Sequence, residues 1–335
     1  MFISVVIPAH RGNDLLNKCI KNIRESLYGD YEIIVIDDFS KPPLTIEDPD
    51  VRLIVGKSKI GPAASRNLGA SQAAGDIILF VDADVMLSKN AYCQILRTFD
   101  TSDYDAVHGI YSLNFPYKDL CSKYKNLYWN FNQMHLDPNG YSICTAIFAI
   151  RKNVFDEIGG FNSVSLIGED KEIGLKLKEK NKKVFQNKDA QGTHYRKFNF
   201  ARLLKHHLEN SIACTVLILK NRGRYPVKHG TAWVEKKQVI GMLLSAIIVS
   251  LTLLAFFTFS SVFFVPAVVA LLIFFCFAAD FLRFSYKRFG LGFSIFAFLM
   301  YLLEEIIAII GICLGILRFF LFKRKDLHFK IEVKP

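Results

Sequence analysis

The feature that most constrains this chain is a long stretch near its carboxyl end that carries no charge. Residues 239–259 contain no Asp, Glu, Lys or Arg over 21 positions, and residues 262–279 form a second such run of 18. A helix of about 20 apolar residues crosses the hydrocarbon core of a bilayer. We therefore predict an α-helical membrane domain at residues 238–322, with helices at about 239–259, 262–279 and 291–322.

The basic residues of the chain concentrate beside these apolar runs. The 335 residues have a net charge of +11, from 42 Lys and Arg against 31 Asp and Glu. Cations that precede an apolar segment favour an anionic membrane surface, and the chain has no motif for nucleic acid. We predict an amphipathic, interfacial segment at 198–237, a basic tail at 323–335, membrane lipids as partners and no nucleic acid.

The topology of the last apolar run stays open. Glu304 and Glu305 interrupt residues 291–322, and carboxylates inside an apolar stretch usually face protein or water. The basic segments 283–288 and 323–325 should both prefer the cytoplasm, yet a single span between them would separate them. Either residues 291–322 do not simply cross the bilayer, or the charge rule fails at the tail.

The cysteines and the amino terminus bear on the compartment. Seven cysteines are scattered without a CxxC pair, which argues against zinc and disulfide frameworks and for a reducing environment. Residues 1–8 lack a basic start and run straight into a strand pattern, unlike a signal peptide. We expect a multi-pass protein of the plasma or inner membrane with its catalytic domain in the cytoplasm.

The first 197 residues alternate short apolar runs with helical patterns, which predicts an α/β domain that binds ligands at the carboxyl ends of parallel strands. The predicted strands are 3–7, 31–36, 51–55, 76–81, 143–150 and 183–186. The predicted helices are 13–26, 62–74, 88–99, 151–158, 171–180 and 198–220. Residues 112–140 are expected to be an irregular loop whose aromatic residues either contact a sugar or lipid or only pack under the domain.

Acidic pairs follow two of the predicted strands. Asp37-Asp38 come after residues 31–36, and Asp82-Ala83-Asp84 come after residues 76–81. Two carboxylates one residue apart can share a hard cation with a diphosphate, and Mg²⁺ and Mn²⁺ take oxygen ligands of this kind. The alternative is that each Asp only caps a helix or makes a turn.

A third acidic pair, Glu169-Asp170, opens a predicted helix. A carboxylate there could take the proton of an attacking hydroxyl as a general base. The alternative is an ordinary acidic helix start, which the helix dipole favours.

Together these motifs resemble family 2 glycosyltransferases of the GT-A (Rossmann-like) fold, over roughly residues 3–195. The matching segments are Ser4-Val5-Val6-Ile7-Pro8-Ala9, Ile33-Ile34-Val35-Ile36-Asp37-Asp38, Gly61-Pro62-Ala63-Ala64-Ser65-Arg66-Asn67, Phe80-Val81-Asp82-Ala83-Asp84, Gly159-Gly160-Phe161-Asn162 and Gly168-Glu169-Asp170. The resemblance implies a GT-A catalytic domain at 1–197 followed by the membrane helices.

The resemblance also implies roles for single residues. The nucleotide-sugar would be bound by Pro8, Ala9, Asp38, Arg66 and Asp82. A Mn²⁺ or Mg²⁺ ion would be bound by Asp84, Asp82 and His194. Asp170 would be the base of an inverting transfer, with Glu169 beside it.

These implications amount to a metal-assisted glycosyltransferase of the hexosyltransferase type. The donor would be a nucleoside diphosphate sugar, UDP-linked by default, and the acceptor a membrane-associated, lipid-linked glycan of the cell envelope. Processive relatives carry a QxxRW-type motif that residues 193–198 do not match, which favours single additions. Three alternatives remain: a polyprenyl-phosphate sugar synthase, a nucleotidyltransferase, and a membrane transport or scaffold protein with a nucleotide-sensing domain.

Overall fold

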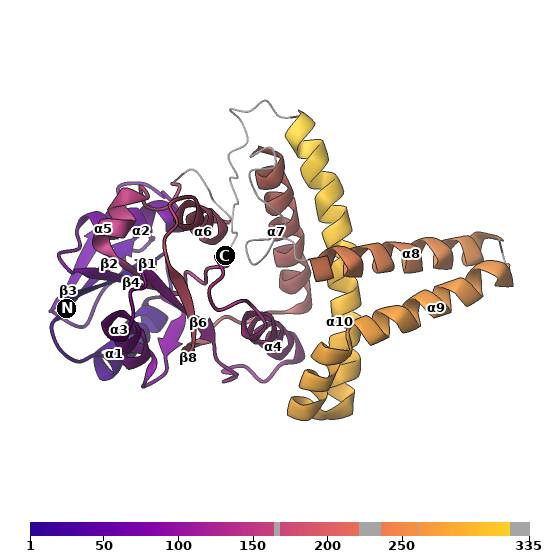
Figure 1. The fold of residues 1–335 in the computed structure, drawn as a ribbon, viewed down its shortest axis with the longest axis horizontal. Helices are drawn as coiled ribbons and strands as arrows, with labels where there is room; N and C mark the ends of the chain where they lie inside the picture. Colours follow the sequence, from indigo (N-terminus) through magenta and orange to yellow (C-terminus); the bar gives the residue numbers. More distant parts are fainter. Residues whose placement is uncertain (164–167, 221–235, 259, 322–335) are drawn as a thin grey trace.

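The computed structural model describes residues 1–163, 168–220, 236–258 and 260–321. An α/β domain at the amino-terminal end is followed by helices that lean against one side of it and then extend away (Figure 1). The basic residues between 221 and 235 and the tail at 323–335 lie outside the described residues. The predicted architecture, a GT-A-like domain followed by apolar helices, is confirmed.

One mixed sheet of eight strands forms the centre of the α/β domain, in the order β3-β2-β1-β4-β7-β6-β8-β5. The strands are β1 Ile3–Ala9, β2 Tyr31–Asp37, β3 Val51–Val55, β4 Ile77–Val81, β5 Val85–Leu87, β6 Ala106–Tyr111, β7 Ile147–Arg151 and β8 Val184–His194. The first four pair in parallel as predicted, whereas β7 is antiparallel to both β4 and β6. The sheet is therefore mixed: β3, β2, β1 and β4 pair in parallel, and beyond β4 only β6 and β8 form another parallel pair.

Helices cover both faces of this sheet because successive strand residues point to opposite sides. Val5 and Ile7 of β1 pack with α1 Asn13–Ser26 and α3 Ala91–Thr101. Val6, between them, packs with the helices of the other face. Those helices are α2 Pro62–Ser71, α5 Lys152–Glu157 and α6 Glu169–Glu179. All strand residues from Ile77 to Val81 are buried, as expected for a strand covered on both sides.

Residues 112–140 are not the irregular loop that we predicted. They contain helix α4 Leu120–Met134, whose first turn is capped by the Asp119 carboxylate accepting a hydrogen bond from Ser122 N at 2.9 Å. Tyr124, Leu127, Tyr128 and Phe131 recur at helical spacing and are buried. Of the two alternatives for these aromatic residues, packing under the domain holds for Tyr124, Tyr128 and Phe131.

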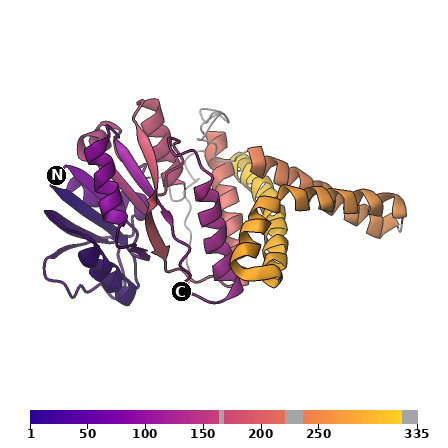
Figure 2. The ribbon, with the colours of Figure 1, turned by 60° about the horizontal axis from the view of Figure 1, so that its bottom comes forward.

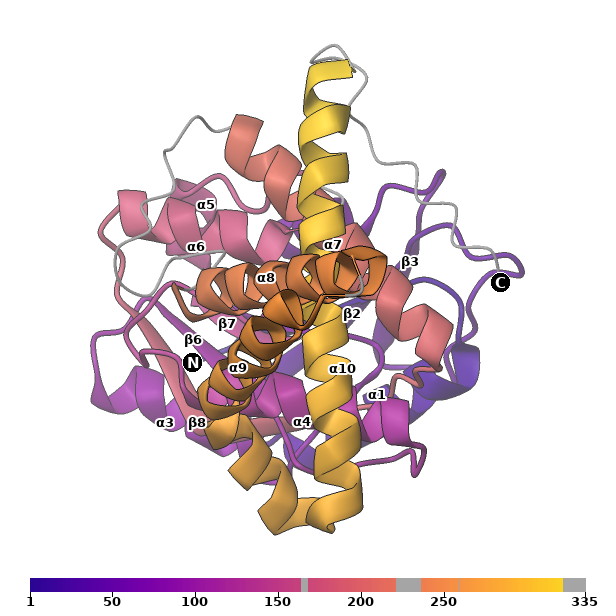
Figure 3. The same ribbon diagram turned by 90° about the vertical axis from the view of Figure 1, so that its right-hand side faces the viewer.

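The carboxyl-terminal helices form a third hydrophobic cluster with α4. They are α7 Phe200–Lys220, α8 Lys236–Thr258, α9 Ser261–Phe277 and α10 Ala279–Leu321. Gly290 breaks α10 with a φ of 80°, so residues 279–289 and 291–321 are two helices that turn back on each other (Figure 3). Among the described residues, two helices are long and apolar enough to cross a membrane, Val239–Thr258 and Ala279–Leu321, and Val262–Phe277 is a shorter apolar helix.

The apolar helices run in two directions. Helices α8 and α9 pair as a hairpin that projects away from the α/β domain, whereas residues 291–321 of α10 cross the base of this hairpin and run beside α7 (Figures 1 and 2). The same crossing is seen from the side, where the hairpin points toward the viewer and α10 stands upright (Figure 3). The three predicted apolar segments are therefore all helical, but they do not form a parallel bundle.

Candidate functional site

A cavity of about 530 Å³ opens at the carboxyl ends of β1 and β4. Its lining includes the predicted Pro8, Ala9, Asp38, Arg66, Asp82, Asp84 and Glu169. It also includes residues that we did not predict, namely His10, Arg11, Gly12, Leu15, Pro62, Ser65 and Ala83. The structure thus places the acids from separate strand ends around one space, which we call the donor cavity.

The two acids after β2 have different surroundings. The Asp37 carboxylate accepts hydrogen bonds from Ser40 N at 2.9 Å and Leu44 N at 3.0 Å, so it holds its own loop. The Asp38 carboxylate accepts hydrogen bonds from Ile60 N at 2.6 Å and Gly61 N at 2.9 Å, and it also lines the donor cavity. Each carboxylate oxygen has two lone pairs, so Asp38 keeps the capacity to accept a hydrogen bond from a ligand.

Arg66 joins two of the predicted site acids. Its side chain is 3% exposed, and it contacts Asp82 Oδ1 at 2.6 Å through Nη2 and Glu169 Oε1 at 3.1 Å through Nη1. Burial raises the pKa of Glu169, the charge of Arg66 opposes that shift and the charge of Asp170 adds to it, so the pKa lies above its usual value. Arg66 therefore fixes the positions of Asp82 and Glu169 relative to α2.

Asp84 lines the donor cavity and contacts His194, which lies behind it and is not itself among the lining residues. His194 is the last residue of β8, which pairs with β5 and so brings Nε2 to 3.3 Å from Asp84 Oδ2. The imidazole stacks on Tyr111, with ring centroids 4.8 Å apart. Burial alone would raise the pKa of Asp84, but the hydrogen bond to His194 and the charge of Arg196 lower it, so the carboxylate is ionised.

These residues can contribute to a metal site without completing one. Within the described ranges, no three His, Cys, Asp or Glu side chains lie close enough together to hold a metal ion. Asp84 supplies a hard oxygen and His194 an imidazole, a pair that suits Mn²⁺, and His194 Nδ1 is buried without a hydrogen-bond partner among the described atoms. The residues present fit a cation whose remaining ligands come from a diphosphate.

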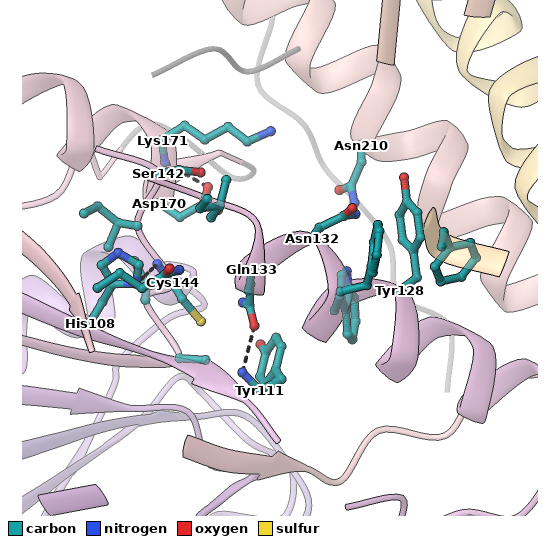
Figure 4. Close-up of a pocket in the computed structure, with 18 of the residues that line it drawn as sticks. His108, Tyr111, Tyr128, Asn132, Gln133, Ser142, Cys144, Asp170, Lys171 and Asn210 are labelled. Carbon is teal, nitrogen blue, oxygen red and sulfur yellow. Dashed lines mark hydrogen bonds between the residues drawn. The ribbon is translucent and has the colours of Figure 1, made fainter. Parts of the chain in front are cut away.

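A second cavity of about 400 Å³ lies on the other side of Asp82, which lines both spaces. Asp170 and Lys171 border it from α6, and Tyr128 and Asn132 from α4 (Figure 4). Figure 4 also shows Asn210 of α7 facing Asn132. Phe277, Phe281 and Tyr301 close the far end from the apolar helices. We call this space the acceptor cavity.

The neighbouring acids Glu169 and Asp170 therefore serve different spaces. Glu169 lines the donor cavity, whereas Asp170 lines the acceptor cavity. Asp170 lies in the first turn of α6, where its carboxylate accepts a hydrogen bond from Lys171 N at 2.9 Å. A general base is expected on the acceptor side, since it must reach the hydroxyl that attacks.

Several residues of the acceptor cavity could not be assigned from the sequence. Trp129 belongs to the misjudged segment 112–140, and its signal would have been the Asp119 cap followed by a helical period. Asn210 and His206 lie on α7, whose sequence fits a membrane-surface helix and a core-packing helix equally, and no role was predicted for His206. No motif marks them, because only the folded chain brings α7 near α6.

The family comparisons agree with this geometry. Residues 4–159 match the model of "Glycosyl transferase family 2". The glycosyltransferase GlyG of Streptococcus pneumoniae is 31% identical over 116 residues, which cover 32% of this chain and 38% of that protein. A GalNAc(5)-diNAcBac-PP-undecaprenol beta-1,3-glucosyltransferase of Campylobacter jejuni is 31% identical over 103 residues, which cover 28% of this chain and 33% of that protein. The chain thus aligns with less than half the length of either relative.

A solved structure shares the architecture beyond the matched domain. The mannosyltransferase PcManGT from Pyrobaculum calidifontis, in complex with GDP-Man and Mn²⁺, superposes with a TM-score of 0.55 at 12% identity. The superposition covers 95% of this chain and 87% of that protein, so it includes the helices that follow the sheet. At this identity the likeness concerns the fold. Sequence match and fold agree that residues 4–159 carry a glycosyl transferase family 2 domain of GT-A-like fold, and apolar helices follow this domain.

Proposed function

We propose that the protein is an inverting glycosyltransferase that moves one sugar per encounter from a nucleoside diphosphate sugar to a hydroxyl of a membrane-associated, lipid-linked acceptor. The observation that carries this proposal is the position of Asp82 between two cavities, with Glu169 on the donor side and Asp170 on the acceptor side. A direct displacement needs donor and acceptor on opposite sides of the reacting carbon. Two cavities that meet at one residue provide this arrangement.

The residues in and beside the donor cavity have separate roles in this proposal. Pro8, Ala9 and Asp38 bound the part of the donor cavity suited to the nucleoside, and Arg66 holds Asp82 in place. When bound, Mn²⁺ or Mg²⁺ would be held by Asp84 and His194 and would neutralise charge on the leaving diphosphate.

Asp170 supplies the acid–base chemistry. Its carboxylate takes the proton of the acceptor hydroxyl as the oxygen bonds to the anomeric carbon and the bond from that carbon to the diphosphate breaks. The sugar is transferred in a single displacement, and the configuration at the anomeric carbon inverts.

Substitution of Asp84 tests the metal role directly. We expect Asp84→Ala to abolish Mn²⁺-dependent sugar transfer and Mn²⁺-dependent thermal stabilisation by a nucleotide-sugar, while circular dichroism stays unchanged. UDP-sugars and GDP-sugars should be screened in parallel, because the residues of the donor cavity do not specify the base. Normal transfer by this variant would exclude the metal role.

The products distinguish the other classes of protein. A nucleotidyltransferase would release pyrophosphate instead of nucleoside diphosphate. A nucleotide-sensing domain would bind the donor without breaking it, so donor hydrolysis that depends on Asp170 would exclude that alternative.

The crossing of the apolar helices suggests how the protein meets the membrane. We propose that the α8–α9 hairpin enters the bilayer and that residues 291–321 of α10 lie along its surface. Exposed apolar side chains cover the hairpin, including Phe256, Phe257 and Phe264 at 67%, 73% and 62% exposure. Both ends of the hairpin would then share one side with the basic segment 283–288, as the charge rule requires. Because residues 291–321 would not cross the bilayer in this arrangement, the basic residues 323–325 would lie on the same side as residues 283–288.

Single cysteines can test this topology. In a cysteine-free background, Ser260→Cys at the tip of the hairpin and Tyr286→Cys beyond its base would be labelled with a membrane-impermeant maleimide in sealed vesicles. The proposal expects the two positions to react from opposite sides. Reaction of both positions from one side would exclude a spanning hairpin.

A further inference from the structure

An apolar groove leads out of the acceptor cavity toward the carboxyl-terminal helices. This groove has a volume of about 460 Å³, and it shares five lining residues with the acceptor cavity: Tyr128, Trp129, Asn132, Lys171 and Asn210. The two spaces are therefore neighbours with a common wall of side chains. A molecule whose reactive end lies at Asp170 could continue into the groove without leaving the protein surface.

Three helices contribute apolar side chains to the groove. Helix α7 contributes Cys214 and Ile218, α8 contributes Met242, and α10 contributes Ile312 and Ile316. None of these residues lines the acceptor cavity, and polar side chains of α7 and α10, among them Ser211 and Glu305, line the groove beside them. The apolar side chains suit a hydrocarbon chain, and the polar residues shared with the acceptor cavity suit a polar head.

Glycines set the spacing of two of these helices. A Cβ atom added at Gly311 of α10 would lie 2.5 Å from Ser211 Cβ of α7, and one added at Gly315 would lie 2.7 Å from Thr215 Cβ. The backbones of α7 and α10 are therefore in direct contact, as small residues at a helix crossing allow. The groove runs beside this contact and is bounded by packed helices instead of loops.

One lysine lies where the groove meets the acceptor cavity. Lys171 follows the proposed base directly in the chain and lines both spaces. Lys125 also lines the groove, but its charge is paired with Glu304, whose Oε1 lies 2.9 Å from Nζ. Lys171 Nζ donates to Cys214 Sγ at 3.2 Å, which directs its charge toward α7. An anionic group between head and chain would meet a complementary charge at this junction.

We propose that the groove holds the isoprenoid chain of the acceptor, with the phosphate that joins chain and head placed at Lys171. This inference rests on the proposed function, since it takes Asp170 as the point where the acceptor reacts. The continuity of the two spaces, the lysine at their junction and the apolar side chains of the groove all support the same occupant. The groove would thereby select lipid-linked acceptors over free saccharides.

Trp129 offers a direct readout of binding. The chain has two tryptophans, and Trp233→Phe leaves Trp129, which lines both spaces, as the single reporter. The fluorescence of this variant would be titrated in detergent micelles with geranyl phosphate and with undecaprenyl phosphate. We expect the longer chain to bind at least about 10-fold more tightly, because more of its hydrocarbon enters the groove.

A matched pair of variants on α10 separates the groove from the outer surface. Ile312→Glu places a carboxylate in the groove and should remove the advantage of the longer chain. Ile310→Glu places the same group at an exposed position outside the groove lining and should leave that advantage intact. Lys171→Met should weaken the binding of both phosphates by a similar factor.

The outcomes separate this inference from the proposed function. The groove proposal would be overturned if Ile312→Glu still bound undecaprenyl phosphate more tightly than geranyl phosphate. It would also be overturned if the protein without the Ile312 change bound the two phosphates with equal affinity. Thermal stabilisation by a nucleotide-sugar in the same preparations would show that the donor site, and with it the proposed function, still stands. Absence of that stabilisation and of any sugar transfer would instead contradict the proposed function itself.

Discussion

The donor and acceptor cavities meet at Asp82 but are built in different ways. Among the described residues, the donor cavity is lined mainly by strand ends and helix starts of the first 84 residues, and Glu169 is the one lining residue from beyond them. The acceptor cavity is lined by His108 and Tyr111 of β6, by Gln186 of β8 and by residues 142–146, together with side chains of α4, α6, α7, α9 and α10. Both cavities therefore use the sheet, whereas the acceptor cavity also depends on the helices that lean on it.

The largest effect expected is kinetic and contrasts two adjacent acids. Asp170→Asn should lower kcat by about 10²–10⁴, the usual contribution of a general base, without changing donor affinity. Glu169→Gln should mainly weaken donor binding, because it removes a partner of Arg66. Steady-state kinetics with donor and acceptor concentrations both varied would measure kcat and the donor KM of each variant. If both substitutions changed donor affinity equally, Glu169 and Asp170 would not serve separate donor and acceptor cavities.

The next effect concerns the buried ion pair that ties α4 to α10. Lys125 and Glu304 have side chains only 4% and 1% exposed, and Tyr124 also donates to Glu304 at 3.1 Å. Lys125→Met should cost about 3–5 kcal/mol of unfolding free energy, because it leaves a carboxylate buried without its cation. Adding Glu304→Met should restore most of that loss.

Denaturant unfolding of the purified protein in detergent micelles would measure both variants. Donor-dependent thermal stabilisation serves as the control, since the pair lies on the acceptor side. If Lys125→Met is as stable as the parent protein, this contact does not hold α10 on the α/β domain.

A smaller effect should come from the contact between α7 and α10. Gly311→Ala should destabilise the protein by about 1–3 kcal/mol, because its methyl group would overlap Ser211. Gly292→Ala is the matched control on the same element, where an added Cβ meets nothing within 4 Å. The midpoint of thermal unfolding should fall for the first variant alone. Equal midpoints would mean that the two helices can separate without cost.

The last effect, which vanishes at neutral pH, is a pH dependence from His206 in the acceptor cavity. Burial, with the charges of Lys125 and Arg196, lowers the pKa of His206 from 6.5 to about 3. Between these values the unfolded chain binds a proton that the folded chain does not, so this residue reduces stability as pH falls below 6.5. His206→Gln should flatten the fall of the unfolding midpoint between pH 6.5 and 4. If the unfolding midpoint of His206→Gln fell with pH as steeply as that of the parent protein, His206 would not be the cause of the pH dependence.

The difference between the cavities also explains what the sequence could predict. Asp38, Asp82 and Asp84 follow β-branched runs, so their shared sheet edge could be inferred from strand order alone. Lys171 and Asn210 reach the acceptor cavity from α6 and α7, whose approach depends on helix packing that leaves no local motif. The predicted loop at 112–140 was wrong for a related reason, since the aromatic residues of α4 serve packing first.

Strand β8 determines where this protein could be shortened. It pairs with β6 on one side and β5 on the other, and it ends at His194. The family match stops at residue 159, so a fragment cut there would lose α6 with Asp170 and would leave two strand edges open to pairing with other chains. Any excised soluble enzyme should therefore extend at least through His194, or it will aggregate before its chemistry can be assayed.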